Sequence, residues 1–459
     1  MPPVPRLHAA MVSILLSVMW PLLFPCVSAH LGGLQPLGGG DLDCGDWLCW
    51  MMDAWEVARR AGRKQNYFLL DDLPLPEESL WGKTQRNGRD EAYMHMLGVN
   101  KRSFKTLSRR FAPLFWHEVG VRKPKGSTRG RRRKSNAEDV LALTLAYLKD
   151  GVGQKHFQGH FGSGSSNVQR SLDLGIKVLA QTLSSMPSAR VEWPDQEKMQ
   201  EYVDTILRRH PDLQGRRVFG FVDGLNLAIE DPSDALEQNS YYNAWLGGCF
   251  CSSILVYAPD GRIIWVRCNA PGTAHDSKVA KPLYQLLLRT CKTGSADGDF
   301  SLAADTAFKS AGALETVIFK PLKCDGLATL ANDDSVSVES LAKSLNRHRS
   351  CVSVRQAAEW GMGSLQKDFK VLTGKLTNDH AKRKVILDCC FMLHNFRMSV
   401  DSSNQIRTTF GEGHLRPLVP RASAPLDAAM FGIETGESTS AQTFARMIES
   451  VRREGGALE

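Results

Sequence analysis

The stretch PGTAHDS at residues 271–277 lies between two strand-like segments that each contain an aspartate. The earlier segment is VFGFVDG at 218–224, and the later one is SLAADTAF at 301–308. A fourth acid follows in a segment of helical character, so the candidate carboxylates are Asp223, Asp276, Asp305 and Glu359. Hard cations such as Mg²⁺ prefer oxygen ligands, and a pair of them can drive phosphodiester chemistry. We therefore expect a metal site built from these acids.

The segments around the acids predict a mixed α/β fold. The first is a buried strand that runs into Asp223, and residues 248–259 and 261–271 are two strands joined by a Pro-Asp-Gly turn. Residues 276–291 have helical periodicity, strand character then returns, and Glu359 lies in a segment with a helical apolar stripe. This order indicates a mixed sheet flanked by helices. Acids on the first strand, the fourth strand and a late helix form the ribonuclease H-like arrangement.

Several short motifs follow one another in order along the chain. They are Asp223-Gly224, the run from Gly272 to Ser277, the turn from Ala304 to Phe308, the group Arg355, Glu359, Gly363 and Leu365, and finally Leu393-His394-Asn395. In this order they resemble the motifs of the PIF/Harbinger transposases and their domesticated nuclease relatives, which are part of the DDE endonuclease group. The resemblance covers roughly residues 90–400.

The resemblance implies a metal-dependent DDE endonuclease or transposase that cleaves DNA phosphodiester bonds by a two-metal mechanism. Asp223, Asp305 and Glu359 are the implied catalytic residues and metal ligands, and Asp276 either binds metal with them or only caps a helix. The implied cofactors are two Mg²⁺ or Mn²⁺ ions, with no small-molecule cofactor. The implied partners are double-stranded DNA, a Myb-like protein and a second copy of the chain. The alternative is a domesticated, catalytically inactive DNA-binding protein on the same fold.

Two motifs depart from the family pattern. Leu225-Asn226 replaces the threonine-histidine that usually follows the first aspartate-glycine, and the turn around Asp305 lacks the two glycines of the family. These changes concern the geometry of the strand ends rather than the metal ligands. Asp333 and Asp334 are rival carboxylates, but their polar, Ser-rich surroundings predict a solvated loop.

A strongly basic stretch precedes the acids. The formal net charge of the chain is +8, and the 13 Lys or Arg residues from Lys101 to Lys134 face the single acid Glu118. Clustered cations release counterions from a phosphate backbone, which gives affinity for any nucleic-acid sequence. The alternative explanation for the run at 129–134 is a solvated loop or a nuclear import signal. The candidate DNA contacts in this run are Arg131, Arg132 and Arg133.

Three short helical segments follow the basic run. Ser135 or Asn136 can cap the first, Gly151 and Gly153 end it, and a Gly/Ser turn at 162–166 precedes the third. Such helices are typical of a helix-turn-helix, in which the first turns of the last helix enter the major groove. A helical bundle that packs on the catalytic domain has the same pattern. The candidate base-reading residues are Asn167, Gln169 and Arg170.

These features predict five parts of the chain. They are an apolar signal-like leader (1–30), a linker region (31–90), a basic helix-turn-helix-like region (91–190), the DDE catalytic domain (195–400) and a flexible tail (401–459). If the protein is a transposase-like nuclease, we expect it in the nucleus. If the leader is a genuine signal peptide, we expect the chain in the secretory pathway. A third hypothesis, a secreted protein with disulfides, requires Cys26, Cys44 or Cys49 to be oxidised. No cysteine spacing indicates zinc, and Cys390 with His394 is expected in the core.

Overall fold

The computed structural model describes residues 70–121, 135–213, 215–294, 298–321, 337–400 and 404–411. The described residues from Pro74 onward belong to one compact unit, and only residues 70–73 are described of the other. No helix within these ranges combines the length and the apolar character needed to cross a membrane. Several predicted features lie outside the described residues: the leader, Arg131, Arg132, Arg133, Asp333, Asp334, the tail beyond 411, Cys26, Cys44 and Cys49.

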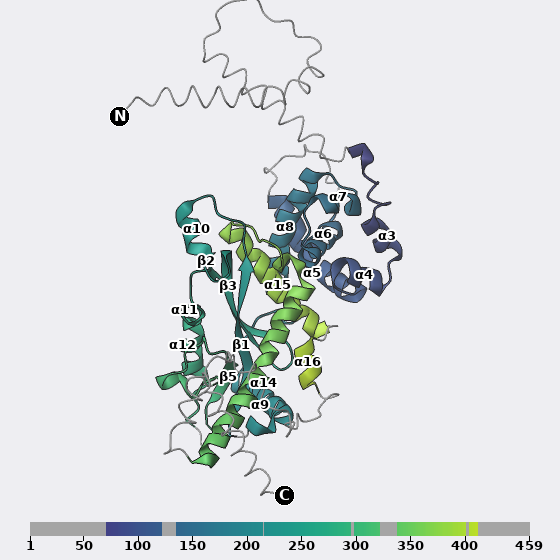
Figure 1. The fold of residues 1–459 in the computed structure, drawn as a ribbon. Coiled ribbons are helices and arrows are strands. Elements are labelled where there is room, and N and C mark those ends of the chain that lie inside the picture. Colours follow the sequence, from purple (N-terminus) through teal and green to yellow (C-terminus); the bar gives the residue numbers. More distant parts are fainter. Residues whose placement is uncertain are drawn as a thin grey trace, which may run out of the picture. The chain divides into compact units, whose positions relative to one another are not determined.

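Helices form the first part of the larger unit (Figure 1). They are α3 (Leu80–Asn87), α4 (Asp90–Leu97), α5 (Lys101–Val121), α6 (Ala137–Asp150), α7 (Lys155–Phe161) and α8 (Ser165–Ser184). The short 3₁₀ helix η1 (Leu70–Asp72) lies before them in the chain. The three helical segments predicted after the basic run are thus present as α6, α7 and α8.

The ends of α6 follow from its sequence. The Asn136 side chain accepts a hydrogen bond from the Asp139 N–H at 2.8 Å, and Asp139 accepts one from the Asn136 N–H at 3.1 Å. This capping box satisfies two backbone donors that a helix start leaves unpaired. Gly151 ends the helix in the left-handed conformation (φ 61°) that glycine adopts without steric cost. The predicted cap is confirmed as Asn136 rather than Ser135.

A six-stranded mixed sheet follows in the described residues. Its strand order is β2-β3-β1-β5-β6. Strand β4 lies off this path and also pairs with β3. β1 runs antiparallel to β3 and parallel to β5, and β5 runs parallel to β6. The strands are β1 (Arg217–Ala228), β2 (Tyr242–Asn243), β3 (Gly248–Tyr257), β4 (Ile263–Pro271), β5 (Phe300–Ala304) and β6 (Ile318–Phe319). The antiparallel β3–β4 pair confirms the predicted hairpin.

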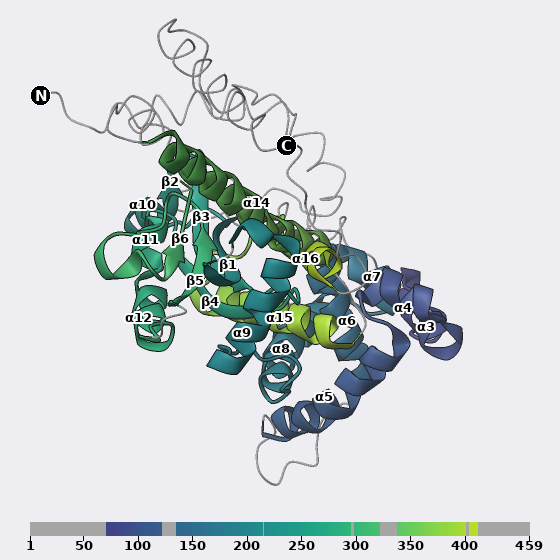
Figure 2. The same ribbon diagram turned by 90° about the horizontal axis from the view of Figure 1, so that it is seen from below.

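Helices cover both faces of the sheet, as predicted (Figures 1 and 2). On one face, α9 (Gln196–Arg209), α11 (Asp276–Val279) and α12 (Lys281–Thr290) share a core cluster with β1, β3, β4, β5 and β6. On the other face, α14 (Val338–Asp368) and α15 (His380–Val400) bury their apolar residues. The remaining short elements are η2 (Pro211–Leu213), α10 (Ala235–Tyr241), η3 (Gly312–Leu314), η4 (Lys370–Leu372) and α16 (Gln405–Phe410).

Three predicted boundaries are wrong. The first strand does not end at Asp223 but continues to Ala228, because these residues pair with β3 as far as Phe250. The helix predicted over 276–291 is interrupted at Ala280, which ends α11 and caps α12. The helical stripe expected after Glu359 through Leu365, Phe369 and Leu372 is cut short, because α14 ends at Asp368 and the backbone of Phe369 is not helical. Pairing with β3 decides the end of β1, which local periodicity does not report.

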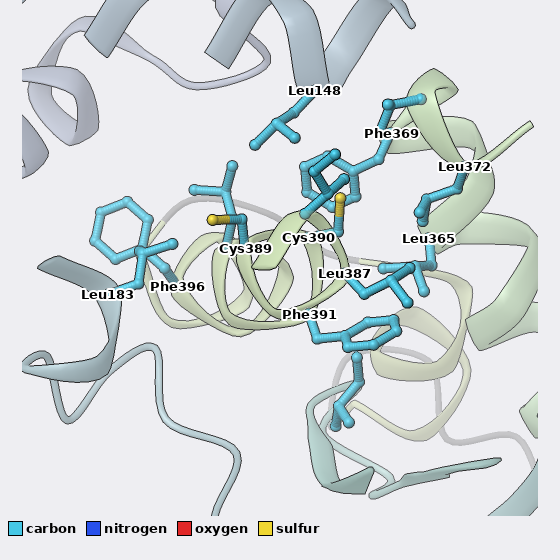
Figure 3. Close-up of a cluster of buried hydrophobic side chains, with 14 of the residues drawn as sticks. Leu148, Leu183, Leu365, Phe369, Leu372, Leu387, Cys389, Cys390, Phe391 and Phe396 are labelled. Carbon is cyan, nitrogen blue, oxygen red and sulfur yellow. The ribbon is translucent and has the colours of Figure 1, made fainter. Parts of the chain in front are cut away.

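Helix α15 lies in the centre of the hydrophobic core (Figure 3). Its Cys389, Cys390 and Phe396 are fully buried. The side chains around α15 in Figure 3 include Leu148 of α6, Leu183 of α8 and Leu365 of α14, and the same cluster includes residues of β1, β3 and β4. One apolar cluster therefore joins the helical region to the sheet. This burial confirms the prediction that Cys390 and His394 are core residues.

Candidate carboxylate site and basic helical surface

Asp223 and Asp305 are brought together by the parallel pair β1–β5. In the register of this pair Val222 lies opposite Ala304, and Asp223 and Asp305 are the next residues on the two chains. Asp305 directly follows the last residue of β5, so its side chain lies at the strand end that the sequence predicted. Neighbouring strands lie about 5 Å apart. The sheet therefore holds two of the predicted acids side by side.

Glu359 is carried to the same place by α14. Figure 2 shows this long helix running along the sheet beside β1. It approaches β3 closely at Gly361, because a Cβ atom there would lie 2.8 Å from the Tyr257 ring. The α14 residues Val354, Ala357 and Ala358 are fully buried. This packing fixes the backbone of the turn that carries Arg355 and Glu359.

Arg355 connects the first and last acids. Its Nη2 donates a hydrogen bond to Oε1 of Glu359 at 2.7 Å, and its Nη1 lies 3.9 Å from Oδ2 of Asp223. The side chains of Arg355 and Asp223 are each 21% exposed, whereas that of Glu359 is 50% exposed. The guanidinium therefore lies between two of the three carboxylates expected to bind metal.

The environment of Asp223 favours its neutral form. Burial raises the pKa of Asp223 to about 6, although the Gly224 N–H and the Arg355 charge act in the opposite direction. The nearby carboxylates of Asp305 and Glu359 raise this pKa further. Like charges held together in a poorly hydrated place are costly unless an ion of opposite charge joins them. The electrostatics thus identify Asp223, Asp305 and Glu359 as one interacting group.

Asp276 approaches β1 from the opposite face. A Cβ atom built on Gly224 would lie 2.8 Å from Oδ2 of Asp276, so only a glycine leaves room for this carboxylate. Adjacent residues of a strand point to opposite faces, and the Asp223 side chain faces Arg355 on α14. Burial, and then the charge of Asp305, raise the pKa of Asp276, while His275 lowers it. Asp305 therefore interacts with acids on both faces of the sheet.

The capping role predicted as an alternative for Asp276 is wrong. The N-cap of α11 is His275, whose Nδ1 accepts a hydrogen bond from the Ser277 N–H at 3.2 Å. Asp276 is the first residue of the helix, where a negative charge interacts favourably with the helix dipole. Its carboxylate is aimed at Gly224 rather than at the start of its own helix.

The donor chemistry of the site fits a divalent metal ion. The oxygen-only set of carboxylates suits Mg²⁺ or Mn²⁺ rather than a thiolate-preferring metal. A cation already lies within this set, in the form of the Arg355 guanidinium. Across the described residues, however, no three His, Cys, Asp or Glu side chains are gathered closely enough to hold an ion. The acids are neighbours, and at least Glu359 has to turn before a common ligand sphere forms.

The two departures from the family pattern have local structural roles. Leu225 is buried in the core on the α14 side of β1. Asn226 accepts a hydrogen bond from Oγ of Ser252 on β3 at 2.6 Å. The turn after β5 closes without glycine through a hydrogen bond from the Phe308 N–H to the Asp305 carbonyl at 3.2 Å, and Phe308 is buried. Both changes leave Asp223 and Asp305 on adjacent strands.

The Leu393-His394-Asn395 motif supports the fold rather than the chemistry. His394 Nε2 lies 3.0 Å from the Gly261 carbonyl, and Asn395 accepts a hydrogen bond from the Ile263 N–H and donates one to the Ile263 carbonyl. These contacts fasten the β3–β4 turn to α15. Burial lowers the pKa of His394, so its ring is neutral. The motif thus helps to hold the hairpin in register.

The predicted base-reading residues lie at the start of α8. Asn167 donates hydrogen bonds to Ser135 Oγ at 3.1 Å and to Ser163 Oγ at 2.6 Å, which ties this helix start to the end of the basic run. Gln169 donates to Asp173 at 2.9 Å, and Arg170 is exposed. Beyond its first turns, α8 is buried among α5, α6 and α15. Its partly exposed beginning is the part available to a partner.

Helix α5 has an exposed basic face, which belongs to the basic stretch that begins at Lys101 and for which no helix was predicted. Phe104, Leu107, Phe111 and Phe115 bury one side of the helix. The other side carries four exposed cations, and none of them forms an ion pair with another described residue: Arg102, Lys105, Arg109 and Arg110. Trp116 on the same helix is 50% exposed. The signal for this face in the sequence is a set of apolar residues at helical spacing that alternate with Lys and Arg.

Comparison with known proteins agrees with the arrangement of the acids. Residues 222–395 match the family described as DDE superfamily endonuclease. The matched segment begins one residue before Asp223, contains Asp276, Asp305 and Glu359, and ends at Asn395. No curated protein and no solved structure matched the chain in the other comparisons. The chain therefore carries a segment similar to DDE endonucleases, without a match specific to the PIF/Harbinger transposases.

Proposed function

We propose that this protein is a metal-dependent DDE endonuclease or transposase that cleaves phosphodiester bonds in double-stranded DNA. The observation that carries the proposal is the meeting of Asp223 and Asp305 on adjacent parallel strands, with Glu359 presented by α14. The match of residues 222–395 to DDE superfamily endonucleases supports the same conclusion. Within this proposal, Asp223, Asp305 and Glu359 are the catalytic residues, and Asp276 is a fourth candidate ligand.

The carboxylates would hold two Mg²⁺ or Mn²⁺ ions. Such ions, when bound, activate a water or hydroxyl nucleophile and stabilise the leaving oxygen. The contribution of the chain is to bring the acids to one place: β1 and β5 position the two aspartates, and α14 carries Glu359. Burial raises the pKa of Asp223 to about 6. Above that pH its carboxylate is charged and can bind a cation, and below that pH it is protonated.

DNA would be bound by the helical region. The exposed face of α5 (Arg102, Lys105, Arg109 and Arg110) provides cations for phosphates, and Arg131, Arg132 and Arg133 extend the basic run. Asn167, Gln169 and Arg170, at the partly exposed start of α8, are proposed to contact base edges, as the last helix of a helix-turn-helix does. On this proposal, α5 contributes affinity and α8 contributes sequence preference.

The direct test is cleavage of labelled double-stranded DNA by the full-length protein with Mg²⁺, with Mn²⁺ and with chelator. We expect nicking that requires the metal and that is absent from the Asp305→Asn variant. Chelator-resistant nicking, or equal nicking by the variant, would contradict the proposal. DNA carrying PIF/Harbinger-type transposon ends should be compared with random DNA to test the finer family assignment.

A second candidate function is a catalytically inactive DNA-binding protein on the same fold. It is favoured by the engagement of Arg355 with both Asp223 and Glu359, which partly neutralises the acids without metal. This candidate predicts salt-dependent DNA binding without nicking in either metal.

Nuclear localisation, a Myb-like partner protein and a homo-oligomer are proposed with the transposase assignment. Fluorescent tagging of the intact chain and light scattering with and without DNA would test localisation and oligomeric state.

A further inference from the structure

Arg355 has a geometry that a simple helix-surface ion pair does not explain. Glu359 is four residues further along α14, and the pair at 2.7 Å is the usual helical spacing. The same guanidinium also reaches Asp223 on β1, at 3.9 Å, through its other terminal nitrogen. It thereby places a positive charge between a strand acid and a helix acid. This is the position that a bound metal ion would share.

We propose that Arg355 is an internal cation that occupies the carboxylate site before metal enters, so that its side chain has to leave Asp223 and Glu359 for the metal to bind. The inference rests on the proposed function, because it assumes that these acids are metal ligands. It adds a positioning residue that sets the metal concentration at which the site fills. In this scheme Arg355 partly neutralises the negative charge of the metal-free site.

The exchange requires only side-chain rotation. The backbone of α14 around Arg355 is fixed by the buried residues Val354, Ala357 and Ala358. Glu359, in contrast, is half exposed, and the Arg355 side chain is 21% exposed. Long exposed side chains change rotamer rapidly. Glu359 can therefore turn readily, and the partly exposed Arg355 side chain can follow while the helix stays in place.

The scheme differs in direction from the ordinary alternative. If Arg355 competes with metal, the metal-free state is stabilised by an ion pair that metal binding has to break, and removing that ion pair tightens metal binding. If Arg355 only orders Glu359 for the metal, removing it weakens metal binding. Because Glu359 is half exposed and the Arg355–Asp223 separation is as long as 3.9 Å, both ion pairs are weak, and we expect the competition to change the metal dissociation constant by about two- to fivefold.

The experiment is calorimetric titration of chelator-stripped full-length protein with Mn²⁺, repeated with Mg²⁺, without DNA. Wild type is compared with Arg355→Gln and Arg355→Met, which both remove the charge, and with Arg355→Lys, which keeps it. Arg349→Gln, an exposed cation on the same helix, is the matched control. We expect Gln and Met at 355 to tighten metal binding, and we expect Lys at 355 and Gln at 349 to leave it near the wild-type value.

Two results would overturn the inference while the proposed function stands. One is metal affinity in Arg355→Gln and Arg355→Met equal to that of wild type, and the other is weaker affinity in both. Asp305→Asn separates the two levels of the argument, because it should lose metal binding whatever Arg355 does. If wild type binds no metal, or if Asp305→Asn binds it normally, the carboxylate site itself is refuted and the role of Arg355 falls with it.

Discussion

The carboxylate site and the exposed face of α5 both collect charges of one sign, but they do so in different surroundings. Asp223 is mostly buried, and its neighbours Asp305 and Glu359 have the same charge. Arg102, Lys105, Arg109 and Arg110 are exposed, and like charges three or four residues apart destabilise a helix by about 0.2–0.5 kcal/mol per pair. In both places, charges of one sign are kept together although they repel one another.

The difference in surroundings decides how the repulsion can be observed in each group of charges. At the carboxylate site burial raises the pKa of Asp223, and the repulsion from Asp305 and Glu359 adds to this effect. On the exposed helix, water and salt screen the charges, so the repulsion is visible only as a dependence on ionic strength. A buried group of like charge is suited to a small, strongly charged ligand such as a metal ion. An exposed row of like charge is suited to a long one such as a phosphate backbone.

The largest expected effect concerns the acids of the carboxylate site. Asp223→Asn, Asp305→Asn and Glu359→Gln should each lower the nicking rate by more than about a hundredfold, because losing a ligand costs more than losing a residue behind it. DNA binding in chelator should change little. Asp276→Asn, on the other face of β1, is the matched comparison and should have a milder effect. An equally complete loss there would make Asp276 a full ligand, and normal nicking by any of the first three would remove that residue from the site.

The next effect concerns the exposed cations. Replacing Arg102, Lys105, Arg109 and Arg110 together by Gln should weaken binding to all DNA sequences and flatten the salt dependence, by about 0.9 in the log–log slope for each phosphate that is no longer neutralised. Fluorescence anisotropy with random duplex at several salt concentrations measures both. Arg289→Gln with Lys292→Gln, at the end of α12, is the control. An unchanged slope would make the α5 face an ordinary solvated surface.

The basic run at 131–133 allows the same measurement. Neutralising Arg131, Arg132 and Arg133 should lower the slope further if these residues also bind phosphates. A full slope with altered localisation would identify the run as an import signal instead. Together the two sets of variants show how much of the affinity each part supplies.

The pKa of Asp223 predicts an effect on stability. Its folded value, about 6, lies above the ordinary value of 3.8, so the stability linked to this residue is full below about pH 4 and is lost as pH rises through 6. The Asp223→Asn variant does not have this loss of stability at high pH. In chelator at pH 8 the variant should therefore be more stable than wild type, by up to about 3 kcal/mol, and the gain should vanish near pH 4. Urea unfolding measures it, and Asp212→Asn, an exposed acid, should show no gain.

The smallest expected effect concerns sequence preference. Replacing Gln169 and Arg170 by Ala should reduce the preference for transposon-end DNA over random DNA by about 1–3 kcal/mol for each bidentate hydrogen-bonded pair with a base that the substitution removes. The salt slope should stay nearly the same. Gln181→Ala, further along the same helix, serves as the control. If the preference survives in a folded variant, recognition lies in a partner protein.

The sequence predicted the main features of the fold because their signals are local. The β3–β4 hairpin followed from two strand-like runs around a Pro-Asp-Gly turn, and α6 followed from a capping residue and a glycine. Asp305 was correctly expected at a strand end. The mixed sheet and its flanking helices followed from the order of these elements.

Other features of the site depend on interactions between distant residues. The Arg355–Glu359 pair is visible in the sequence as a spacing of four, but the approach of Arg355 to Asp223 depends on how α14 crosses β1. The face from which Asp276 approaches depends on the alternation of Asp223 and Gly224 along β1, and on the path of the chain after β4. The continuation of β1 to Ala228 required its pairing with β3. No local pattern contains these relations.

The position of α15 has a consequence for how the protein unfolds. This helix is buried between the helical region and the sheet, and its loss would expose apolar surface of both at once. The two regions should therefore melt in a single cooperative transition, although their sequences suggest separate modules. A truncated chain that starts at residue 195 would keep α15 but lack the α6 and α8 surfaces that cover it, leaving Cys389 and Phe396 open to water. Such a fragment should aggregate, so the catalytic part depends for its solubility on the helices that are proposed to find its substrate.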